Sequence, residues 1–579
     1  MQFSHLLKTT LLGTSLALAF QFPADAQIAS GLRYDSSYPI ISPVKAKQGM
    51  VVSEQRLASE VGQAILQRGG NAIDAAIAVG FALAVVLPNA GNIGGGGFMV
   101  IHDAKTGQDL ALDFRELAPE KAHRDMFLDK DGKVIARASW FSHLAVGVPG
   151  TVAGMEAAHQ KLGSLPWAEL VKPAIKLAEQ GFTISPYLAE LLQSSKSELS
   201  RWPASKAIFF KGDQPLSAGD LLVQRDLAKS LQAIAEHGAK AFYQGWIADK
   251  IATEMTKHGG LIQSKDLQNY RAVWRPVVKG DYRGYQIVAM PAPSSGGVHI
   301  VQMLNMLEHF PLAEQGANSA ATLHQLSEVM KLAYADRSEY LGDPDFYRVP
   351  SKGITSKAYA AALVKQINLE KARPASEIKP GQPQTYESEQ TTHYSTADRW
   401  GNAVATTYTL NLNFGSAIVA EGTGILLNNE MDDFAIKAGV PNAFGLTGGD
   451  ANAVGPLKRP LSSMSPTIVL KDNKPVLITG SPGGSRIITT TLQTILNVID
   501  FNMNVAEATI SPRIHQQWQP DQLRFEKGIS IDTLNLLQQK GQNLKLAPVL
   551  GKTQTIQIKA DRFEAFSDTR NPDGAALGF

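Results

Sequence analysis

The chain of 579 residues contains no cysteine. This absence excludes disulfide bridges, metal sites built on thiolates and a cysteine nucleophile. Any covalent chemistry must therefore use a hydroxyl, an amine, an imidazole or a carboxylate. The chain also lacks a strong charge of either sign, because 55 Lys and Arg stand against 53 Asp and Glu. The composition gives no support for a globally basic nucleic-acid-binding surface or an acidic tail.

Long hydrophobic runs are missing as well. After the N-terminus the longest is Ala75 to Leu87, which is too short to span a bilayer and is predicted to be a buried helix. Residues 1–26 have the basic start, short apolar stretch and small-residue end (Ala24-Asp25-Ala26) of a secretory signal peptide. We expect export to the periplasm, with no membrane anchor once this segment is removed.

Familiar metal and nucleotide motifs are absent too. The sequence has no HExxH, no P-loop, no GxSxG and no EF-hand loop, and its 12 histidines are scattered. No metal and no organic cofactor is expected. The run from Gly91 to Gly97 is not a dinucleotide fingerprint, because a helix precedes it and a strand follows. Tight turns and close backbone packing are its predicted use.

What is present is a globular composition, with 44% hydrophobic and 19% charged residues. Residues 53–88, 150–260 and 318–366 have mainly helical patterns, whereas the chain after 390 is richer in strands. The mixture predicts α/β or α+β layers. Residues 366–390 are polar, contain three prolines and lack periodicity, which predicts an exposed connector.

A β-hairpin is predicted around Trp400. If the turn is centred there, opposed residue numbers sum to about 800, so that Thr391 faces Thr409 and Asn411 lies next on the same face. The pattern alone is also that of an ordinary threonine-rich hairpin.

A second hairpin has its turn at residues 471–474, and pairing with sums of about 945 brings Ser462 and Ser463 close to Pro482 and Gly483. The return strand leads through a glycine-rich turn into a helix over 486–499. Such a junction directs backbone N–H groups at one point, as an oxyanion hole or carboxylate site requires. A plain tight turn is the alternative.

Two further segments lie between the hairpins. Glu430, Asp432 and Asp433 fall within four residues, which suits a cationic ligand group or, alternatively, a solvated acidic turn. Residues 441–452 are rich in Gly and Asn and are predicted to form a mobile loop.

Together these segments resemble the γ-glutamyltranspeptidase family over roughly residues 40–579. The segments that carry the resemblance are Asn89–Gly97, Asp113–Glu116, Gln390–Ser395, Leu426–Phe434, Gly448–Asn452, Pro460–Pro466 and Gly480–Arg486. The resemblance implies an α+β four-layer αββα sandwich, the N-terminal-nucleophile hydrolase fold. It also implies a precursor that cuts itself between Gln390 and Thr391 into a large chain, 27–390, and a small catalytic chain, 391–579, which stay together as a heterodimer.

The implied activity is that of a γ-glutamyltransferase and glutathione hydrolase. The enzyme cleaves the γ-glutamyl amide of glutathione and related compounds through an ester on Thr391, and passes the glutamyl group to water, amino acids or dipeptides. This implied mechanism is chemically reasonable, because a threonine hydroxyl becomes a good nucleophile only next to a base. Cleavage frees the α-amine of Thr391 as that base, and its unperturbed pKa is about 7.7–8.0.

The resemblance also assigns roles to individual residues. Thr391 is the nucleophile and Thr409 hydrogen-bonds near it, Gly483 and Gly484 form the oxyanion hole, Arg115, Ser462 and Ser463 hold the substrate α-carboxylate, and Asn411, Glu430 and Asp433 hold the α-ammonium. Two residues depart from familiar bacterial members: Glu430 stands where Gln is frequent, and Phe444 stands where a lid tyrosine is familiar.

Two alternatives remain open. A β-lactam acylase of the glutaryl or cephalosporin type shares the fold and the self-cleavage, but its acyl group would leave Glu430 and Asp433 without an ammonium. A periplasmic amino-acid-binding protein would need no scissile Gln390–Thr391 bond.

Overall fold

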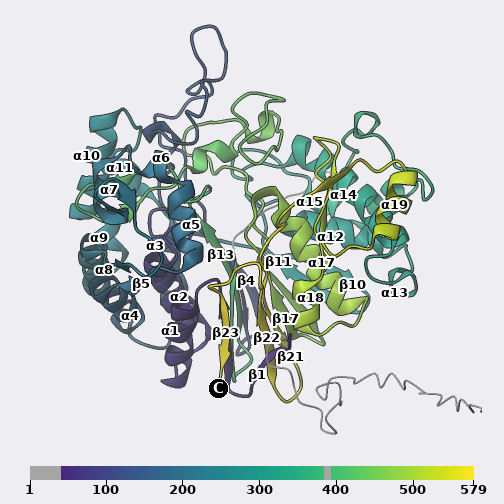
Figure 1. Cartoon of the computed structure of the whole chain (residues 1–579), viewed down its shortest axis with the longest axis horizontal. Coiled ribbons are helices and arrows are strands. Elements are labelled where there is room, and N and C mark those ends of the chain that lie inside the picture. The colour runs from purple at the N-terminus through teal and green to yellow at the C-terminus, as the bar shows by residue number, and fades with distance from the viewer. Residues whose placement is uncertain (1–40, 384–392) are drawn as a thin grey trace, which may run out of the picture. The chain divides into compact units, whose positions relative to one another are not determined.

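The computed structural model describes residues 41–383 and 393–579. The predicted signal peptide (1–26) and the junction Gln390–Thr391 lie outside these residues. Ser42–Phe579 form one unit, built around two stacked seven-stranded sheets with helices on both outer faces (Figure 1). This is the predicted order of helix, sheet, sheet and helix layers.

The strands of the first sheet are, in spatial order, β1 (Val44–Ala46), β22 (Phe563–Ser567), β21 (Gln554–Ile558), β17 (Lys474–Thr479), β16 (Thr467–Lys471), β11 (Tyr285–Ala289) and β10 (Val278–Tyr282). Those of the second are β23 (Ala575–Gly578), β2 (Gly49–Ser53), β12 (Tyr394–Asp398), β13 (Ala403–Thr409), β3 (Gly96–Asp103), β4 (Gln108–Phe114) and β9 (Val273–Arg275). All neighbouring strands within each sheet run antiparallel where their pairing is described.

The longer helices are α1 (Arg56–Gln67), α2 (Ala72–Val86), α3 (Thr151–Leu162), α4 (Trp167–Gln180), α5 (Pro186–Ser194), α8 (Arg225–His237), α10 (Trp246–His258), α12 (Gly296–Leu307), α14 (Ala320–Tyr340), α16 (Lys357–Val364), α17 (Ile487–Ile499) and α19 (Ile531–Gln539). α1, α2 and α4 share a core with the second sheet, and α12, α14 and α17 share one with the first. A third cluster, which includes Phe98, Ile468 and Ile556, fills the space between the sheets.

Helix α2 is the buried helix that the apolar run predicted. All 15 of its residues are buried, which fits a helix that is apolar on every side. Its start is fixed by a capping box: Asp74 N–H donates to Asn71 Oδ1 at 2.9 Å, and Asn71 N–H donates to Asp74 Oδ2 at 3.0 Å.

The glycine run before β3 is used for close backbone packing, as predicted. A Cβ on Gly95 would lie 2.0 Å from Thr409 O, and one on Gly94 would lie 2.0 Å from Leu426 O. Only residues without a side chain let these segments approach so closely. The run therefore packs directly against Thr409 at the end of β13 and against Leu426.

The two hairpins test the predicted registers. In the first, Tyr394 faces Thr406 and the numbers sum to 800, so this prediction is confirmed for the described residues. In the second, Leu470 faces Pro475 as predicted, but an irregularity between Val469 and Leu470 shifts the remaining pairs by one residue. The predicted sum of 945 is therefore wrong beyond the turn, because a β-bulge adds one residue to one strand only.

The prediction of an exposed connector is confirmed for most of its described part, because 10 of the residues 366–383 are exposed and only three of them are buried. Ala372, Ala375 and Ile378 are buried, and Ala375 N–H donates to Asp521 Oδ2 at 2.8 Å. The segment is therefore mainly exposed and is attached to the rest of the chain at these buried residues. Among residues 41–383 and 393–579, none of the helices has the length and apolar character needed to cross a membrane.

Candidate active site

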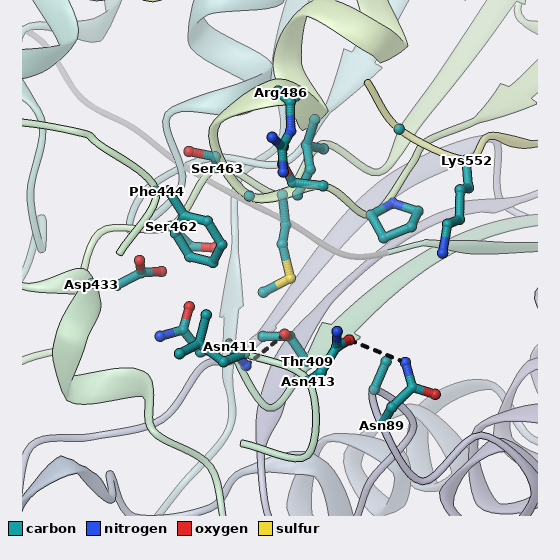
Figure 2. Close-up of a pocket in the computed structure, with 18 of the residues that line it drawn as sticks. Asn89, Thr409, Asn411, Asn413, Asp433, Phe444, Ser462, Ser463, Arg486 and Lys552 are labelled. Carbon is teal, nitrogen blue, oxygen red and sulfur yellow. Dashed lines mark hydrogen bonds between the residues drawn. The ribbon is translucent and has the colours of Figure 1, made fainter. Parts of the chain in front are cut away.

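A cavity of about 330 Å³ opens where the C-terminal end of β13 meets the glycine-rich turn after β17 (Figure 2). Eight of the residues predicted from the sequence line it: Thr409, Asn411, Glu430, Asp433, Ser462, Ser463, Gly483 and Gly484. Gln390 and Thr391 lie outside the described residues, and Arg115 is not among the lining residues. These eight residues come from four separate segments of the chain.

Thr409 and Asn411 form one wall at the end of β13. Asn411 has a φ of +79°, a left-handed conformation that Asn tolerates better than most residues. Its N–H donates to Thr409 Oγ1 at 2.8 Å, and its side-chain amide donates to Asn429 O at 3.0 Å. This turn ends the strand and fixes both polar side chains beside the cavity.

The neighbouring wall carries an acidic cluster around one arginine. Arg115 is fully buried, and its Nη1 and Nη2 donate to Glu430 Oε1 at 2.5 Å and Asp433 Oδ2 at 2.7 Å. Its Nε donates to Pro460 O at 3.2 Å. Both ends of the guanidinium fork are therefore occupied by carboxylates of the pocket wall, and contact between Arg115 and a substrate carboxylate stays a prediction.

Glu116 is a third buried acid of this cluster, which the sequence analysis missed. Its carboxylate lies 3.6 Å from Arg115 Nη1, and neither of its oxygens has a hydrogen-bond partner among the described residues. Burial raises the pKa of Glu116 to about 7 and holds the pKa of Glu430 well above its usual range. With Glu116, Glu430 and Asp433 around one guanidinium, the cluster is short of positive charge and suits a cationic ligand group.

Asp432, the third acid of this segment, does not belong to the cluster. Its Oδ1 accepts from Ser139 Oγ at 2.7 Å and Trp140 Nε1 at 2.9 Å, and its Oδ2 accepts from Ala443 N–H at 3.0 Å. Burial raises the pKa of Asp432 to about 6. Asp432 is a structural acid that ties the loop carrying Phe444 to the rest of the chain.

Phe444 covers the glycine-rich turn. A Cβ on Gly484 would lie 2.3 Å from the Phe444 ring, so the two are in close contact. Asn442 holds the loop, because its Oδ1 accepts from Phe444 N–H at 3.0 Å and its Nδ2 donates to Asp433 Oδ1 at 3.1 Å. The loop is thus attached to the acidic cluster itself.

Ser462 and Ser463 are positioned by a buried arginine of α14 that no sequence pattern marks. Arg337 Nη2 donates to Ser463 Oγ at 3.1 Å, and its Nε donates to Ser295 Oγ at 2.8 Å. Burial lowers the pKa of Arg337, and the positive charge it keeps lies directly behind the two serines. An anionic group bound by these serines would be stabilised by that charge.

The glycine-rich turn has the conformation that a site for negative charge requires. Gly483 and Gly484 have φ values of +139° and +58°, in the region that favours glycine. Within the part of the chain that the structure describes, no acceptor takes the N–H of either residue. Both donors stand beside the cavity at the start of the short helix (Gly484–Arg486) that leads into α17.

One group of side chains in the described segments has the composition of a metal site, but it lies outside this pocket. His143 Nε2, Glu254 and His258 present ligand atoms within 4.8 Å of one another. The two imidazole rings stack with centroids 4.7 Å apart and planes at 22°, so that their lone pairs run side by side rather than converging. We assign no ion to this group.

Comparison with known proteins agrees with this geometry. A family model described as Gamma-glutamyltranspeptidase matches residues 58–578. The chain is 56% identical to a protein named glutathione hydrolase proenzyme from Escherichia coli K12, over 96% of each chain. Among solved structures, a γ-glutamyltranspeptidase from Helicobacter pylori is 50% identical with a TM-score of 0.58, and covers 59% of this chain and 97% of its own. A cephalosporin acylase from Bacillus halodurans is 27% identical with a TM-score of 0.83, over 95% and 99%.

The stacked sheets, their helical layers and these structural neighbours define an enzyme with the N-terminal-nucleophile hydrolase fold. Within that class, the extent of the family match and the 56% identity decide the narrower assignment. The chain belongs to the γ-glutamyltranspeptidase family.

Proposed function

We propose that the chain is a periplasmic glutathione hydrolase and γ-glutamyltransferase, made as a precursor. Residues 1–26 direct export and are removed. The precursor then cuts itself between Gln390 and Thr391, and the chains 27–390 and 391–579 remain together as a heterodimer. The observation that carries this proposal is the pocket itself. An acidic cluster faces the same cavity as a glycine-rich turn whose N–H groups have no acceptor among the described residues.

The proposed reaction uses the freed amine of Thr391 as the base for its own hydroxyl. The hydroxyl oxygen attacks the γ-carbonyl carbon, and its proton passes to the amine. The N–H groups of Gly483 and Gly484 stabilise the oxyanion that forms. The intermediate collapses to a γ-glutamyl ester on Thr391, while the leaving amine takes the proton. Water or the amine of an amino acid or dipeptide then attacks the ester by the same route.

Substrate selection follows from the charges of the pocket. Asn411, Glu430 and Asp433 face the α-ammonium of the γ-glutamyl group, which supplies the positive charge that the acidic cluster lacks. Ser462 and Ser463, with Arg337 behind them, and Arg115 at the cluster serve the α-carboxylate. An ammonium and a carboxylate on one carbon are the recognition features of an α-amino acid.

The same charges disfavour the acylase alternative. A glutaryl or cephalosporin side chain has no α-ammonium, so it would leave the buried acids uncompensated, which is unfavourable in a site of low polarity. The family match and the identity to glutathione hydrolase proenzymes support the same choice.

The test is made on the purified mature protein. Mass spectrometry is expected to give two chains, 27–390 and 391–579, and the protein is expected to hydrolyse γ-glutamyl-p-nitroanilide much faster than glutaryl-7-aminocephalosporanic acid. A single uncut chain, or the opposite substrate preference, would overturn the proposal.

A further inference from the structure

The loop tip over the cavity, Phe444 and Gly445, is held by a residue that the proposed reaction does not use. Gln517 lies just after the short strand β18 (Ile514–His515), and its side chain is buried. Its Nε2 donates to Gly445 O at 3.1 Å and to Phe444 O at 3.4 Å. Phe444 lines the cavity (Figure 2), and its ring offers no polar atom for a hydrogen bond. The tip is therefore attached to Gln517 through its backbone.

The other end of the same amide holds the glycine-rich turn. Gln517 Oε1 accepts from Ser485 Oγ at 2.9 Å, and Ser485 directly follows Gly484, a proposed oxyanion donor. The carbonyl of Ser485 accepts in turn from the hydroxyl of Tyr334 on α14. Ser485 is thus fixed at its side chain by Gln517 and at its backbone by Tyr334.

The surroundings of Gln517 determine which way its amide points. Three carbonyl oxygens, those of Phe444, Gly445 and Gln519, lie around the nitrogen, and only an NH₂ group can bond them. His515 Nε2 lies 2.9 Å from the amide oxygen, and burial lowers the pKa of His515 to about 3. The imidazole is therefore neutral near pH 7 and can donate to this oxygen. Both ends of the amide have partners, and the two ends cannot be exchanged.

The two contacts of Gln517 meet at Gly484. A Cβ on Gly484 would lie 2.3 Å from the Phe444 ring, so the loop tip rests directly on this residue, and Ser485 continues the chain from it. Gly484 has a φ of +58°, and its N–H has no acceptor among the described residues. The direction of that N–H therefore depends on its neighbours, and a shift of about 1 Å in a catalytic group is costly.

We propose that Gln517 is a positioning residue for the reaction. It holds the loop tip and the glycine-rich turn in one arrangement, so that the N–H of Gly484 points at the developing oxyanion only while the loop covers the cavity. Closure of the loop and stabilisation of the transition state are then a single event. The inference rests on the proposed function, because it takes Gly484 to be an oxyanion donor.

Gln517→Met removes both contacts with a side chain of similar size. We expect kcat for γ-glutamyl-p-nitroanilide to fall at least ~10-fold, the effect of one or two lost hydrogen bonds. KM should change far less, because the oxyanion forms only in the transition state. Gln224→Met is the matched control: Gln224 is equally buried and donates to Val85 O at 2.8 Å, and its kcat should stay at the wild-type value.

A double-mutant cycle with Phe444→Ala tests whether Gln517 acts through the loop tip. Phe444→Ala removes the ring from Gly484, so that the loop no longer supports the turn. The factor by which Gln517→Met lowers kcat should therefore be at least ~3-fold smaller in the Phe444→Ala background than in the wild type. Equal factors in the two backgrounds, or a wild-type kcat in Gln517→Met, would overturn the positioning role.

Digestion with chymotrypsin separates this inference from the proposed function, because it needs no activity of the protein itself. The fragment that begins at Gly445 should appear at least ~10-fold faster in Gln517→Met than in the wild type or in Gln224→Met, since cleavage requires local opening of the loop. Gln517→Glu should show the same acceleration, because a carboxylate cannot donate to the carbonyls of the loop tip. Unchanged cleavage in both Gln517 variants would overturn the inference alone. A wild-type protein that releases no p-nitroaniline would overturn the proposed function, and with it the catalytic role of Gln517.

Discussion

Arg115 Nη2 donates to Asp433 Oδ2 at 2.7 Å, and the two residues are 318 positions apart in the sequence. One belongs to the predicted large chain and the other to the predicted small chain. The acid that is expected to meet the substrate ammonium is therefore held in place from the other side of the cut. Both chains must contribute to one binding site.

Replacing the predicted nucleophile tests maturation and turnover together. Thr391→Ala is expected to remain a single chain without activity, because both reactions need the hydroxyl. Thr391→Ser keeps a hydroxyl and an amine and should still mature. Denaturing gels and hydrolysis of γ-glutamyl-p-nitroanilide are the measurements. Two chains from Thr391→Ala would show that another residue performs the cut.

Asp433→Asn tests recognition of the ammonium. The change is nearly isosteric, and loss of one partner of a buried ion pair should lower kcat/KM for γ-glutamyl-p-nitroanilide by about 30-fold or more. Glutaryl-p-nitroanilide carries no ammonium, so its kcat/KM should fall far less. Asp450→Asn, whose side chain is 91% exposed, is the control. An equal fall for both substrates would remove Asp433 from the ammonium site.

Arg115→Lys tests the fork that joins two acids. A lysine ammonium cannot occupy the positions of both Nη groups, so Glu430 and Asp433 lose a shared partner. We expect KM for γ-glutamyl-p-nitroanilide to rise at least ~10-fold, with a lower thermal midpoint, because hydrogen bonds to charged groups are lost in a buried site. Arg562→Lys, on an exposed hairpin turn, should change neither quantity. Unchanged values in Arg115→Lys would mean that the fork is not needed.

The raised pKa values of Glu116 and Glu430 predict that ligand binding releases a proton near pH 7. Burial keeps these acids partly protonated in the free site, and an arriving ammonium lowers their pKa. The calorimetric enthalpy of L-glutamate binding should therefore depend on the ionisation enthalpy of the buffer. Glutarate, which lacks the ammonium, should show a smaller dependence. Equal enthalpies for L-glutamate in phosphate and Tris would contradict the coupling.

His393 provides a pH prediction for stability. Burial lowers its pKa from 6.5 to about 3, and its hydrogen-bonding neighbours among the described residues are Ser395, Thr407 and Gln554. Between these two values the unfolded chain binds a proton that the folded chain does not, so stability falls as the pH falls below 6.5. At pH 5 the loss is about 2 kcal/mol, at ~1.4 kcal/mol per pH unit.

His393→Asn should therefore show a smaller drop of the thermal midpoint between pH 7 and pH 5 than the wild type. His237→Asn, with an exposed imidazole, should behave as the wild type does. Because His393 stays neutral at these pH values, the acid limb of the kcat/KM profile should be the same in His393→Asn and wild type. A shifted limb would assign that limb to His393 rather than to the amine of Thr391.

The sequence predicted the structure correctly where the conformation depends on neighbouring residues. The turn around Trp400 and the alternation of its flanks predicted the register in which Tyr394 faces Thr406. The bulge between Val469 and Leu470 left no such mark, because a β-bulge depends on how neighbouring strands fit together. The same alternation therefore predicted one hairpin fully and the other only at its turn.

In the pocket, too, some residues could be predicted from the sequence and others could not. Eight lining residues were predicted because they stand in segments that resemble a known family. Asp432 was grouped with its neighbours on charge alone, although its hydrogen bonds to Ser139 and Trp140 make it structural. Arg337 and Glu116 were missed, because their importance comes from burial near Ser463 and near Asp433, respectively, which are far away in the sequence. Contacts of this kind leave no recognisable pattern in the sequence around each residue.

The strand order of the second sheet has a consequence for how the mature protein comes apart. In this sheet the predicted small chain contributes β23, β12 and β13. The predicted large chain contributes β2, which lies between β23 and β12, and also β3, β4 and β9, which continue the sheet beyond β13. Strands of the two chains are thus interleaved, and separating the chains breaks the sheet at three places: between β23 and β2, between β2 and β12, and between β13 and β3. Dilution should release no free subunit from the cut protein, and separately refolded halves should not exchange with it. Dissociation and unfolding should be observed as one transition.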